Sequence, residues 1–488
     1  MFSCNAVYPS ALVILFLGFD PGAAMPAYRI AWSIIMANRS SHEIDILEGP
    51  IFKKYISFII PLAMGYILQL LFNAADVIIV GQFAGALALA AVGSTTALVN
   101  LYLQIYVGLA TGVNIEVAGA YATGNTSRVS GIVHTSVGFS FVCGIFFLVF
   151  GIATVKPMLI VTGTPEDILE MAALYLYIYC LGIPASVIYN FGAAILRSIG
   201  DTKRPMYYLI AAGIVNFVLN IVSVVFLHMG VAGVATATTV SNYISALLIM
   251  TALLKEESCL RLIPSQINLN RSVVADIIKF GLPVALQNSL FTIPNIMIQS
   301  SVNAFGSVCV AGNSASQSLE GFQLAFLNAN GIAAATFTSQ HYSAGKYRRA
   351  DRVMRILILS SVCMSITIGI LFVTFKTQLL GLYNSDPAVI EIGAKRLEII
   401  VLTDFLDSTM CVLSNIIRGM GRSLAPMVIT MIFVCGFRMI WLLILCPIVN
   451  EYTFIIMAWP VSWILAVLVM SIYYAVIRRG FPREDVVS

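Results

Sequence analysis

The chain repeats one stretch of sequence: Leu196-Arg-Ser-Ile-Gly-Asp-Thr-Lys-Arg-Pro205 returns 221 residues later as Ile417-Arg-Gly-Met-Gly-Arg-Ser-Leu-Ala-Pro426. An Arg, a Gly and the Pro fall on the same positions of both copies. At the same offset, Ala122-Thr-Gly-Asn125 aligns with Ser343-Ala-Gly-Lys346. Matches at one constant distance indicate that the chain consists of two halves with the same internal arrangement.

The composition excludes a soluble protein. Of the 488 residues, 59% are hydrophobic and only 10% are charged, and the mean hydropathy is +0.93. Soluble domains carry about a quarter charged residues, so most of this chain must lie in lipid. At about 20 residues per span, there is room for roughly a dozen helices and for no large catalytic domain in water, so we expect no enzyme. The net charge of +4 predicts no nucleic-acid partner.

Twelve apolar runs of helical length follow one another, six in each half. Strands of a membrane barrel would alternate apolar and polar residues over about ten positions, and these runs do not alternate. The sequence therefore predicts twelve transmembrane helices. The runs are Ile56–Val80, Ala88–Val113, Gly131–Ala153, Met171–Ile195, Met206–His228, Val231–Leu254, Phe280–Asn303, Val308–Ala335, Ile356–Phe375, Leu397–Ile417, Met427–Val449 and Phe454–Ile477.

Six helices is an even number, so both halves enter the membrane from the same side. The predicted fold class is an all-α integral membrane protein with twelve transmembrane helices in two six-helix lobes, related by a pseudo-twofold axis along the membrane normal. Parallel repeats of this kind are typical of transporters whose substrate path runs between the lobes. We expect lobes at 51–254 and 280–477, a cytoplasmic linker at 255–279 and a cytoplasmic tail at 478–488.

Residues 1–50 form an N-terminal extension in this prediction. The apolar stretch Ala11–Phe19 is too short to span a membrane, and the absence of a preceding Lys or Arg makes it a poor signal peptide. Because Met36 opens a more ordinary protein start, we expect residues 1–35 to be dispensable.

The positive charges set the orientation. With both termini in the cytoplasm, twenty Lys and Arg residues face that side, and only Lys156, Lys376, Lys395 and Arg396 face the other. This is the bias of the positive-inside rule. The sequence therefore predicts a multi-pass protein of the plasma (inner) membrane with both termini cytoplasmic.

Polar groups deep in the first half predict a site. A charged group inside a span costs roughly 2.5–3.5 kcal/mol on insertion scales, so it needs a partner or a role. Asp76 lies 20 residues into the first helix, in the outer half of the membrane. Asn216 and Asn220 lie one turn apart on one face of the fifth helix, and Thr238 lies at a similar depth in the sixth. We predict that one carboxylate and three neutral oxygen donors gather at one level.

Such a set suits a monovalent cation, which prefers hard oxygen ligands, one negative charge and neutral groups that stay satisfied when the ion leaves. A proton would also serve, because burial favours the neutral carboxyl. The alternative is structural: Asp76 would cap a kink or pair with a partner, and the two Asn would hold packed helices together. The scattered His and Cys residues have no metal-site spacing.

The second half has its own intramembrane charges. Asp404 and Asp407 lie three residues apart in the tenth helix, and Arg438 has a matching depth in the eleventh. An Asp407–Arg438 ion pair is expected from these depths, with either a structural or a transport role. Glu320 lies among polar residues of the eighth helix, so we expect that helix to face the substrate cleft, against a buried hydrogen-bonded carboxyl. Glu116 is expected near the interface, with its head group reaching water.

In this order, several short motifs resemble the multidrug and toxic compound extrusion (MATE) transporters. The motifs are Pro61 with Asp76-x-x-x-x-Gly81, Leu196-Arg-Ser-Ile-Gly-Asp201, Asn216-x-x-x-Asn220, Gly230-Val-Ala-Gly-Val-Ala-Thr-Ala-Thr238, Gln340-His-Tyr-Ser-Ala-Gly-Lys346 with Arg349, and Ile417-Arg-Gly-Met-Gly421. The resemblance implies a coupling-cation site at Asp76, Asn216, Asn220 and Thr238. It also implies a functional aspartate at Asp407.

Two features depart from the family pattern. His341 and Ser343 stand where the family usually has Asn and Gly. The run Phe280–Asn303 contains no carboxylate, whereas the NorM-like branch has a glutamate there. The resemblance therefore does not extend to a NorM-type cation site in the second half.

The function that we expect is antiport: export of amphipathic, cationic organic compounds in exchange for H⁺ or Na⁺, with Asp76 as the switch, no other cofactor and a monomeric chain. A lipid-linked saccharide flippase is the alternative. Its anionic substrate would need several intramembrane Arg or Lys residues, and the sequence offers only Arg438. A membrane-embedded transferase or protease would need paired Asp motifs, a Ser/His dyad or metal-binding histidines, which do not occur.

Overall fold

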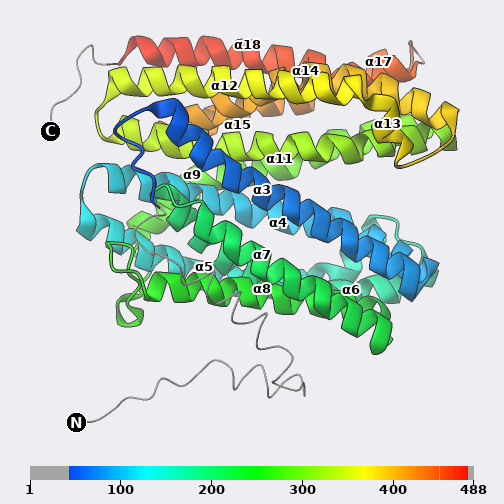
Figure 1. Cartoon of the computed structure of the whole chain (residues 1–488), viewed down its shortest axis with the longest axis horizontal. Coiled ribbons are helices and arrows are strands. Elements are labelled where there is room, and N and C mark those ends of the chain that lie inside the picture. Colours follow the sequence, from blue (N-terminus) through cyan, green and yellow to red (C-terminus); the bar gives the residue numbers. More distant parts are fainter. Residues whose placement is uncertain (1–42, 450, 482–488) are drawn as a thin grey trace. The chain divides into compact units, whose positions relative to one another are not determined.

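The computed structural model describes residues 43–449 and 451–481, and the structural statements below refer to these residues. The prediction that residues 1–35 are dispensable lies outside them. Within the described ranges the chain forms helices and no strand (Figure 1). The predicted fold class is confirmed.

The first lobe contains the helices from α3 to α8. Two of its helices continue as π-helical segments, labelled η. The elements are α3 (Ile51–Ile79) with η1 (Val80–Ala84), α4 (Ala86–Ala122), α5 (Thr126–Val161), α6 (Glu166–Ser198), α7 (Lys203–Asn220) with η2 (Ile221–Phe226), and α8 (Gly230–Leu254).

The second lobe contains the helices from α9 to α18, and the short 3-10 turn η3 (Pro264–Gln266) lies in the linker before it. The elements are α9 (Arg271–Leu290) with α10 (Thr292–Asn303), α11 (Ser307–Ser343), α12 (Tyr347–Thr374) with α13 (Lys376–Gly381), α14 (Pro387–Gly419), the series α15 (Leu424–Thr430), η4 (Met431–Gly436), α16 (Phe437–Ile440) and η5 (Trp441–Leu445), and α17 (Tyr452–Ile456) with α18 (Ala458–Arg479).

Each predicted span corresponds to one helical segment. Eleven segments of the described chain are long and apolar enough to cross a membrane, and α11 supplies the twelfth. The hydropathy of α11 is lower because polar residues such as Asn313, Gln317 and Gln323 interrupt it. The helices also run past the apolar runs, because a helix ends at its cap and not where its hydrophobic stretch ends.

The helix ends show the repeat at the level of the backbone. Gly124 follows α4 with a φ of 70°, and Gly345 follows α11 with a φ of 68°. Gly200 and Gly421, at φ 95° and 80°, end α6 and α14 in the same way. Both pairs are 221 residues apart, and glycine is favoured because other residues rarely adopt a positive φ. The motif that recurs in the sequence therefore marks equivalent turns in the two lobes.

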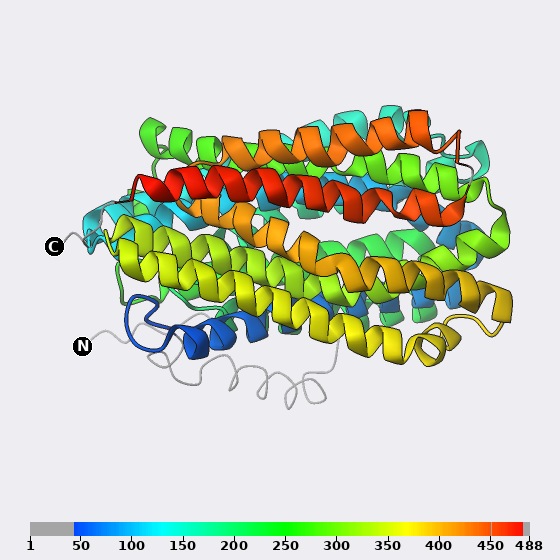
Figure 2. The same cartoon turned by 90° about the horizontal axis from the view of Figure 1, so that it is seen from above.

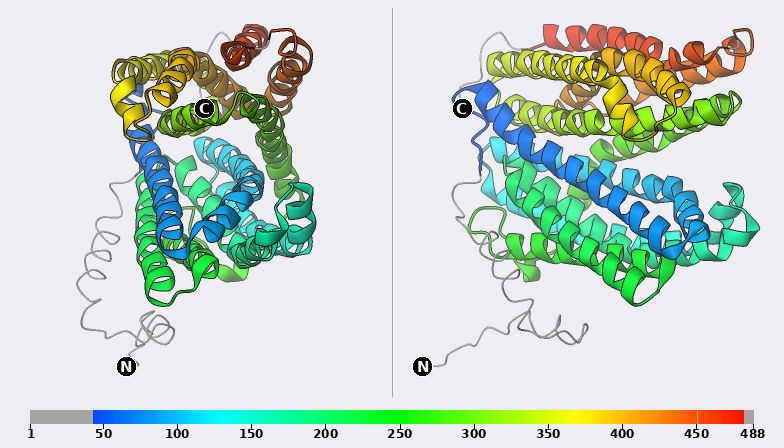
Figure 3. Two further views of the ribbon diagram at one scale, coloured as in Figure 1. Left: turned by 90° about the vertical axis from the view of Figure 1, so that its right-hand side faces the viewer. Right: turned by 45° about the vertical axis from the view of Figure 1, so that its right-hand side comes forward.

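Each lobe is built around one central helix. In the first lobe α6 packs against α4, α5 and α8, and in the second lobe α14 packs against α11, α12 and α18. The end-on view in Figure 3 (left) shows the blue-to-green helices and the yellow-green-to-red helices as two neighbouring groups. The view from above in Figure 2 shows the second-lobe helices α12, α14 and α18 running alongside one another.

The lobes meet along α4 and α9. A Cβ atom built on Gly112 would overlap the Ile277 carbonyl oxygen, and one built on Gly281 would lie 2.7 Å from the Leu109 Cα. Only glycines allow the two backbones to approach this closely. We call the end of the lobes where α3 begins and α18 ends the basic end, after Lys53, Arg128, Arg204, Arg348 and Arg478 at its helix termini. The seam lies in the half of α4 nearer this end and along the middle of α9.

Hydrogen bonds reinforce the seam. Thr336 Oγ1 donates to Asn114 Oδ1 at 2.9 Å, Ser339 Oγ donates to the Ile115 carbonyl at 2.8 Å, and Gln340 Nε2 donates to the Ser198 carbonyl at 2.6 Å. All three join the last turns of α11 to the first lobe. The structure is therefore a state in which the lobes are joined at the basic end.

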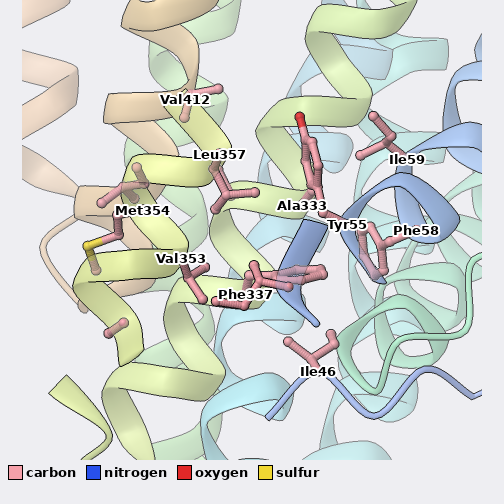
Figure 4. Close-up of a cluster of buried hydrophobic side chains, with 14 of the residues drawn as sticks. Ile46, Tyr55, Phe58, Ile59, Ala333, Phe337, Val353, Met354, Leu357 and Val412 are labelled. Carbon is pink, nitrogen blue, oxygen red and sulfur yellow. The ribbon is translucent and has the colours of Figure 1, made fainter. Parts of the chain in front are cut away.

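Helix α3 crosses from one lobe to the other, as its diagonal course in Figure 1 shows. Its first half packs into the second lobe, where Tyr55, Phe58 and Ile59 lie in one buried cluster with Phe337 and Leu357 (Figure 4). Its second half packs on α7, where the ring of Phe72 lies on Gly213. One continuous helix therefore links the two lobes.

Substitution of Gly281 by Val tests the seam. The added side chain would force α9 off the α4 backbone, so we expect the free energy of unfolding to fall by about 1–3 kcal/mol. Melting of the detergent-solubilised protein measures this. Gly131→Val in α5 is the control, because nothing lies within 4 Å of a Cβ atom built there. Equal melting temperatures for the two variants would contradict the tight seam.

Candidate cation site and substrate cleft

Hydrogen bonds link the four polar residues predicted for the first lobe. Asn220 Nδ2 donates to Asp76 Oδ1 and also, at 3.2 Å, to Asn216 Oδ1. Asn216 Nδ2 in turn donates to Thr238 Oγ1 at 3.4 Å. The structure thus brings together one carboxylate, two amides and one hydroxyl from α3, α7 and α8.

Irregular helix geometry surrounds this site. Helix α3 continues as η1 four residues after Asp76, and α7 gives way to η2 directly after Asn220. The two π-helical segments contact each other, and both contact α8. π-Helical turns are uncommon and occur frequently at functional sites. They place the ends of α3 and α7 side by side at the level of the site.

The site has more acceptors than donors. Asn220 is fully buried, yet its Oδ1 atom accepts no hydrogen bond from any described residue. A buried acceptor without a partner is unfavourable by about 1–3 kcal/mol. The amide cannot simply rotate, because its Nδ2 group already donates to Asp76 and Asn216. This oxygen and the partly buried Asp76 carboxylate form an electron-rich pair that a cation would satisfy.

The donor chemistry at this site favours a hard monovalent ion or a proton. The described residues contain no group of three His, Cys, Asp or Glu side chains that could hold a metal ion. One carboxylate with amide and hydroxyl oxygens is a set that suits Na⁺, and the carboxylate alone suits H⁺.

In the second lobe, Glu320 is bound to Arg396, which we had counted among the positive charges of the outer side. Arg396 Nε and Nη2 donate to the two Glu320 carboxylate oxygens at 2.8 and 2.7 Å, and Arg396 Nη1 donates to Asn313 Oδ1 at 3.1 Å. The guanidinium also lies 4.8 Å from the centroid of the Trp459 ring. Arg396 is only 2% exposed. Arg396 is therefore buried inside the second lobe and is not a water-facing charge, as its count among the charges of the outer side implied.

The cause of that error is the position of a helix start. Helix α14 begins at Pro387, where Asp386 caps it, and not at the apolar run that opens with Leu397. Arg396 therefore lies more than two turns inside the helix. Glu320 accordingly is an ion-paired carboxylate and not one that faces a wet cleft without a partner.

The two aspartates of α14 differ in their surroundings. Asp404 Oδ2 accepts hydrogen bonds from Gln323 Nε2 at 2.7 Å and from Ser365 Oγ at 2.9 Å. Asp407 is partly buried and accepts no hydrogen bond from the residues that the structure describes. Among the carboxylates that we expected to line the cleft, Asp407 is thus the one whose oxygens remain available.

The expected Asp407–Arg438 ion pair is not formed within 4 Å among the described residues. Arg438 Nε donates instead to Ser462 Oγ at 2.9 Å. Its guanidinium lies 5.6 Å and 5.9 Å from the ring centroids of Trp459 and Trp463. The aromatic faces and the hydroxyl stabilise the buried cation, so a direct carboxylate partner is not required.

The basic end contains two small cavities at the seam. Glu116 forms a salt bridge with Arg128 at 2.9 Å, and both residues line a cavity of about 450 Å³ beside Asp276. A second cavity of about 230 Å³ lies between α4, α11 and the end of α14. Glu116 is itself largely buried. We expected its head group to reach open water, but it reaches Arg128 instead.

A family model described as MatE matches residues 61–222 and, a second time, residues 283–444. The chain belongs to the MatE family. This MATE transporter carries one copy of the family unit in each lobe, and the family resemblance predicted from the motifs is confirmed.

Relatives with known names support the assignment. The MATE chain is 28% identical to a probable multidrug resistance protein NorM of Thermotoga maritima, over 79% of this chain and 84% of that one. It is 26% identical to the probable multidrug resistance protein YoeA of Bacillus subtilis, over 78% of this chain and 83% of that one. Its fold matches a structure described as the outward-facing conformation of a multidrug resistance MATE family transporter, with a TM-score of 0.83, 19% identity and coverage of 91% and 99%. At that identity the structural match concerns the fold.

Removal of Arg396 tests the buried ion pair. Arg396→Met would leave Glu320 charged and without its partner, so we expect the free energy of unfolding to fall by about 3–5 kcal/mol. Lys395→Met is the control on the same helix, because the Lys395–Glu391 pair is exposed and water screens its attraction. Chemical or thermal unfolding in detergent measures both. A similar loss of stability in the two variants would contradict the buried pair.

Proposed function

We propose that this MATE transporter is an antiporter that exports amphipathic, cationic organic compounds in exchange for H⁺ or Na⁺, with Asp76 as the ion-loading group. The single observation that carries the proposal is the unsatisfied oxygen of Asn220 beside the Asp76 carboxylate. The names of the multidrug-resistance relatives support the substrate class.

The coupling ion would bind among the oxygens of the first lobe. Na⁺ would take the Asp76 carboxylate, the free Asn220 Oδ1, the Asn216 Oδ1 and the Thr238 hydroxyl as ligands. A proton would sit on Asp76 alone. In both cases binding neutralises the one negative charge of the site, so the ends of α3 and α7 lose the attraction between Asp76 and the Asn220 amide.

The distribution of charges supports an orientation in the membrane. The basic end carries the excess of Lys and Arg, so the positive-inside rule supports a cytoplasmic basic end, with the chain in the plasma (inner) membrane and both termini inside. The lobes are joined at that end. Substrate would therefore leave toward the outside in this state, and the coupling ion would load from outside.

The substrate would meet Asp407 in the second lobe. Glu320 is paired with the Arg396 guanidinium, and Asp404 already accepts hydrogen bonds from Gln323 and Ser365. Asp407 has no such partner among the described residues and is the carboxylate that an organic cation can approach. A flippase for an anionic lipid-linked saccharide is not favoured, because it would need several available cations. Arg396 is paired with Glu320, and Arg438 is enclosed by Ser462, Trp459 and Trp463.

The substitution Asp76→Asn tests the ion-loading role. Proteoliposomes that contain the full chain are loaded with ethidium, a fluorescent organic cation, and either a pH gradient or a Na⁺ gradient is imposed. We expect wild type to move ethidium against its gradient with one of the two ions. Asp76→Asn should lose this activity, because an amide has no negative charge for Na⁺ to balance and does not take up a proton near neutral pH. Asp167→Asn, an exposed carboxylate of the same lobe, should transport as wild type does. Normal ethidium efflux by Asp76→Asn would remove the proposal.

A second test concerns substrate binding. Asp407→Asn should raise the apparent KM for ethidium about tenfold, equivalent to about 1.4 kcal/mol of lost attraction, with a smaller effect on kcat. Glu391→Gln, which removes an exposed charge of the same helix, is the control. An unchanged KM in Asp407→Asn would show that this carboxylate does not contact the substrate.

A further inference from the structure

Two polar side chains of α3 lie in different lobes. Asp76, near the end of the helix, is bound to Asn220 of the first lobe. Tyr55, near its beginning, is 1% exposed and lies inside the second lobe. The Tyr55 hydroxyl donates a hydrogen bond to Asn330 Oδ1 of α11 at 2.5 Å. The stick view in Figure 4 shows the Tyr55 side chain among the residues of the second-lobe cluster.

Buried hydrogen bonds continue from Asn330 across the second lobe. Asn330 Nδ2 donates to Ser361 Oγ of α12 at 3.1 Å, and the Ser361 hydroxyl is hydrogen-bonded to the Ser408 hydroxyl of α14. Asn330, Ser361 and Ser408 are all buried. Ser408 directly follows Asp407 in the chain. An unbroken series of polar contacts thus leads from α3 to the helix that carries the available carboxylate of the cleft.

The start of α3 is held firmly on the second lobe. Ile46, in the segment before α3, is buried in the same cluster as Tyr55. Arg349 Nη2 of α12 donates to the Gly49 carbonyl at 2.7 Å. Between the two ends of α3 lie Pro61 and Gly65, and proline removes one backbone hydrogen bond at that point. Helix α3 is therefore a rod fixed at both ends, with its weakest point between them.

We propose that Tyr55 is the positioning residue through which the ion-loaded state of Asp76 is transmitted to the second lobe. The inference rests on the proposed function. If the buried hydrogen bond between the Tyr55 hydroxyl and the Asn330 amide broke, no water would be present to replace it. Tyr55 and Asn330 therefore move together. A displacement of α3 when the ion binds is then carried into α11, α12 and α14. The coupling between ion and substrate depends on that bond.

Tyr55→Phe removes the hydroxyl and keeps the ring. The measurement is the factor by which the saturating coupling ion changes the Kd of ethidium for the purified full chain. We expect Tyr55→Phe to reduce this factor at least threefold, with the ethidium Kd without ion within twofold of wild type. Tyr106→Phe is the matched control: Tyr106 is equally buried, but its hydroxyl bonds Ser186 at 3.0 Å within the first lobe. Its factor should equal that of wild type.

The outcomes separate this inference from the proposed function. If the coupling ion changes the ethidium Kd of Tyr55→Phe by the same factor as that of Tyr106→Phe, the role of Tyr55 is overturned and the antiport proposal stays intact. A wild-type chain in which neither H⁺ nor Na⁺ changes the ethidium Kd would overturn both. If Tyr55→Phe does not yield folded protein, Ser361→Ala carries the test, with Ser136→Ala in α5 as its control. If the coupling ion changes the ethidium Kd of Ser361→Ala by the same factor as that of Ser136→Ala, the inference is equally overturned.

Discussion

The hydrogen bond from Asn220 to Asp76 is the interaction on which the rest of the structure depends. It ties the end of α3 to the end of α7 at a level where lipid surrounds the lobe and a bare charge costs roughly 2.5–3.5 kcal/mol. The bond also fixes the orientation of the Asn220 amide, which leaves its oxygen buried and without a donor. The proposed ion-loading role rests on this combination of one carboxylate and one buried acceptor without a partner, because a single bound cation would satisfy both.

Because α3 runs from one lobe to the other, a change at Asp76 can affect the second lobe. The helix begins in the hydrophobic cluster of the second lobe and ends in the polar cluster of the first. The seam between α4 and α9 is made of close backbone contacts, which allow sliding or separation but little compression. A change in the direction of α3 at one end must therefore be absorbed by its own bend near Pro61 or be passed to the other lobe. In our proposal, the buried bond from Tyr55 to Asn330 favours transmission to the second lobe.

Much of this could be predicted from the sequence, because apolar length and the repeat are properties of the chain itself. The twelve spans, the two lobes and the meeting of Asp76, Asn216, Asn220 and Thr238 follow from run lengths and from equal depth in the membrane. The contacts of the charged residues in the second lobe could not be predicted in this way, because depth in the membrane does not determine which way a side chain points. Arg396 was misplaced since α14 starts ten residues before its apolar run. Tyr55 could not be singled out, because it lies directly before the apolar run Ile56–Val80 and its role depends on a hydrogen-bond partner that is 275 residues away in the chain.

The most direct test of the central claim is ion binding to the purified full-length protein without substrate or gradient. Proton uptake on acidification and binding of radioactive Na⁺ would be measured on wild type and on Asp76→Asn. We predict that each wild-type chain binds one saturable ion, either H⁺ or Na⁺, and that this binding is lost when Asp76 is replaced. Undiminished binding of that ion to the Asp76→Asn protein would contradict the ion-loading role of Asp76.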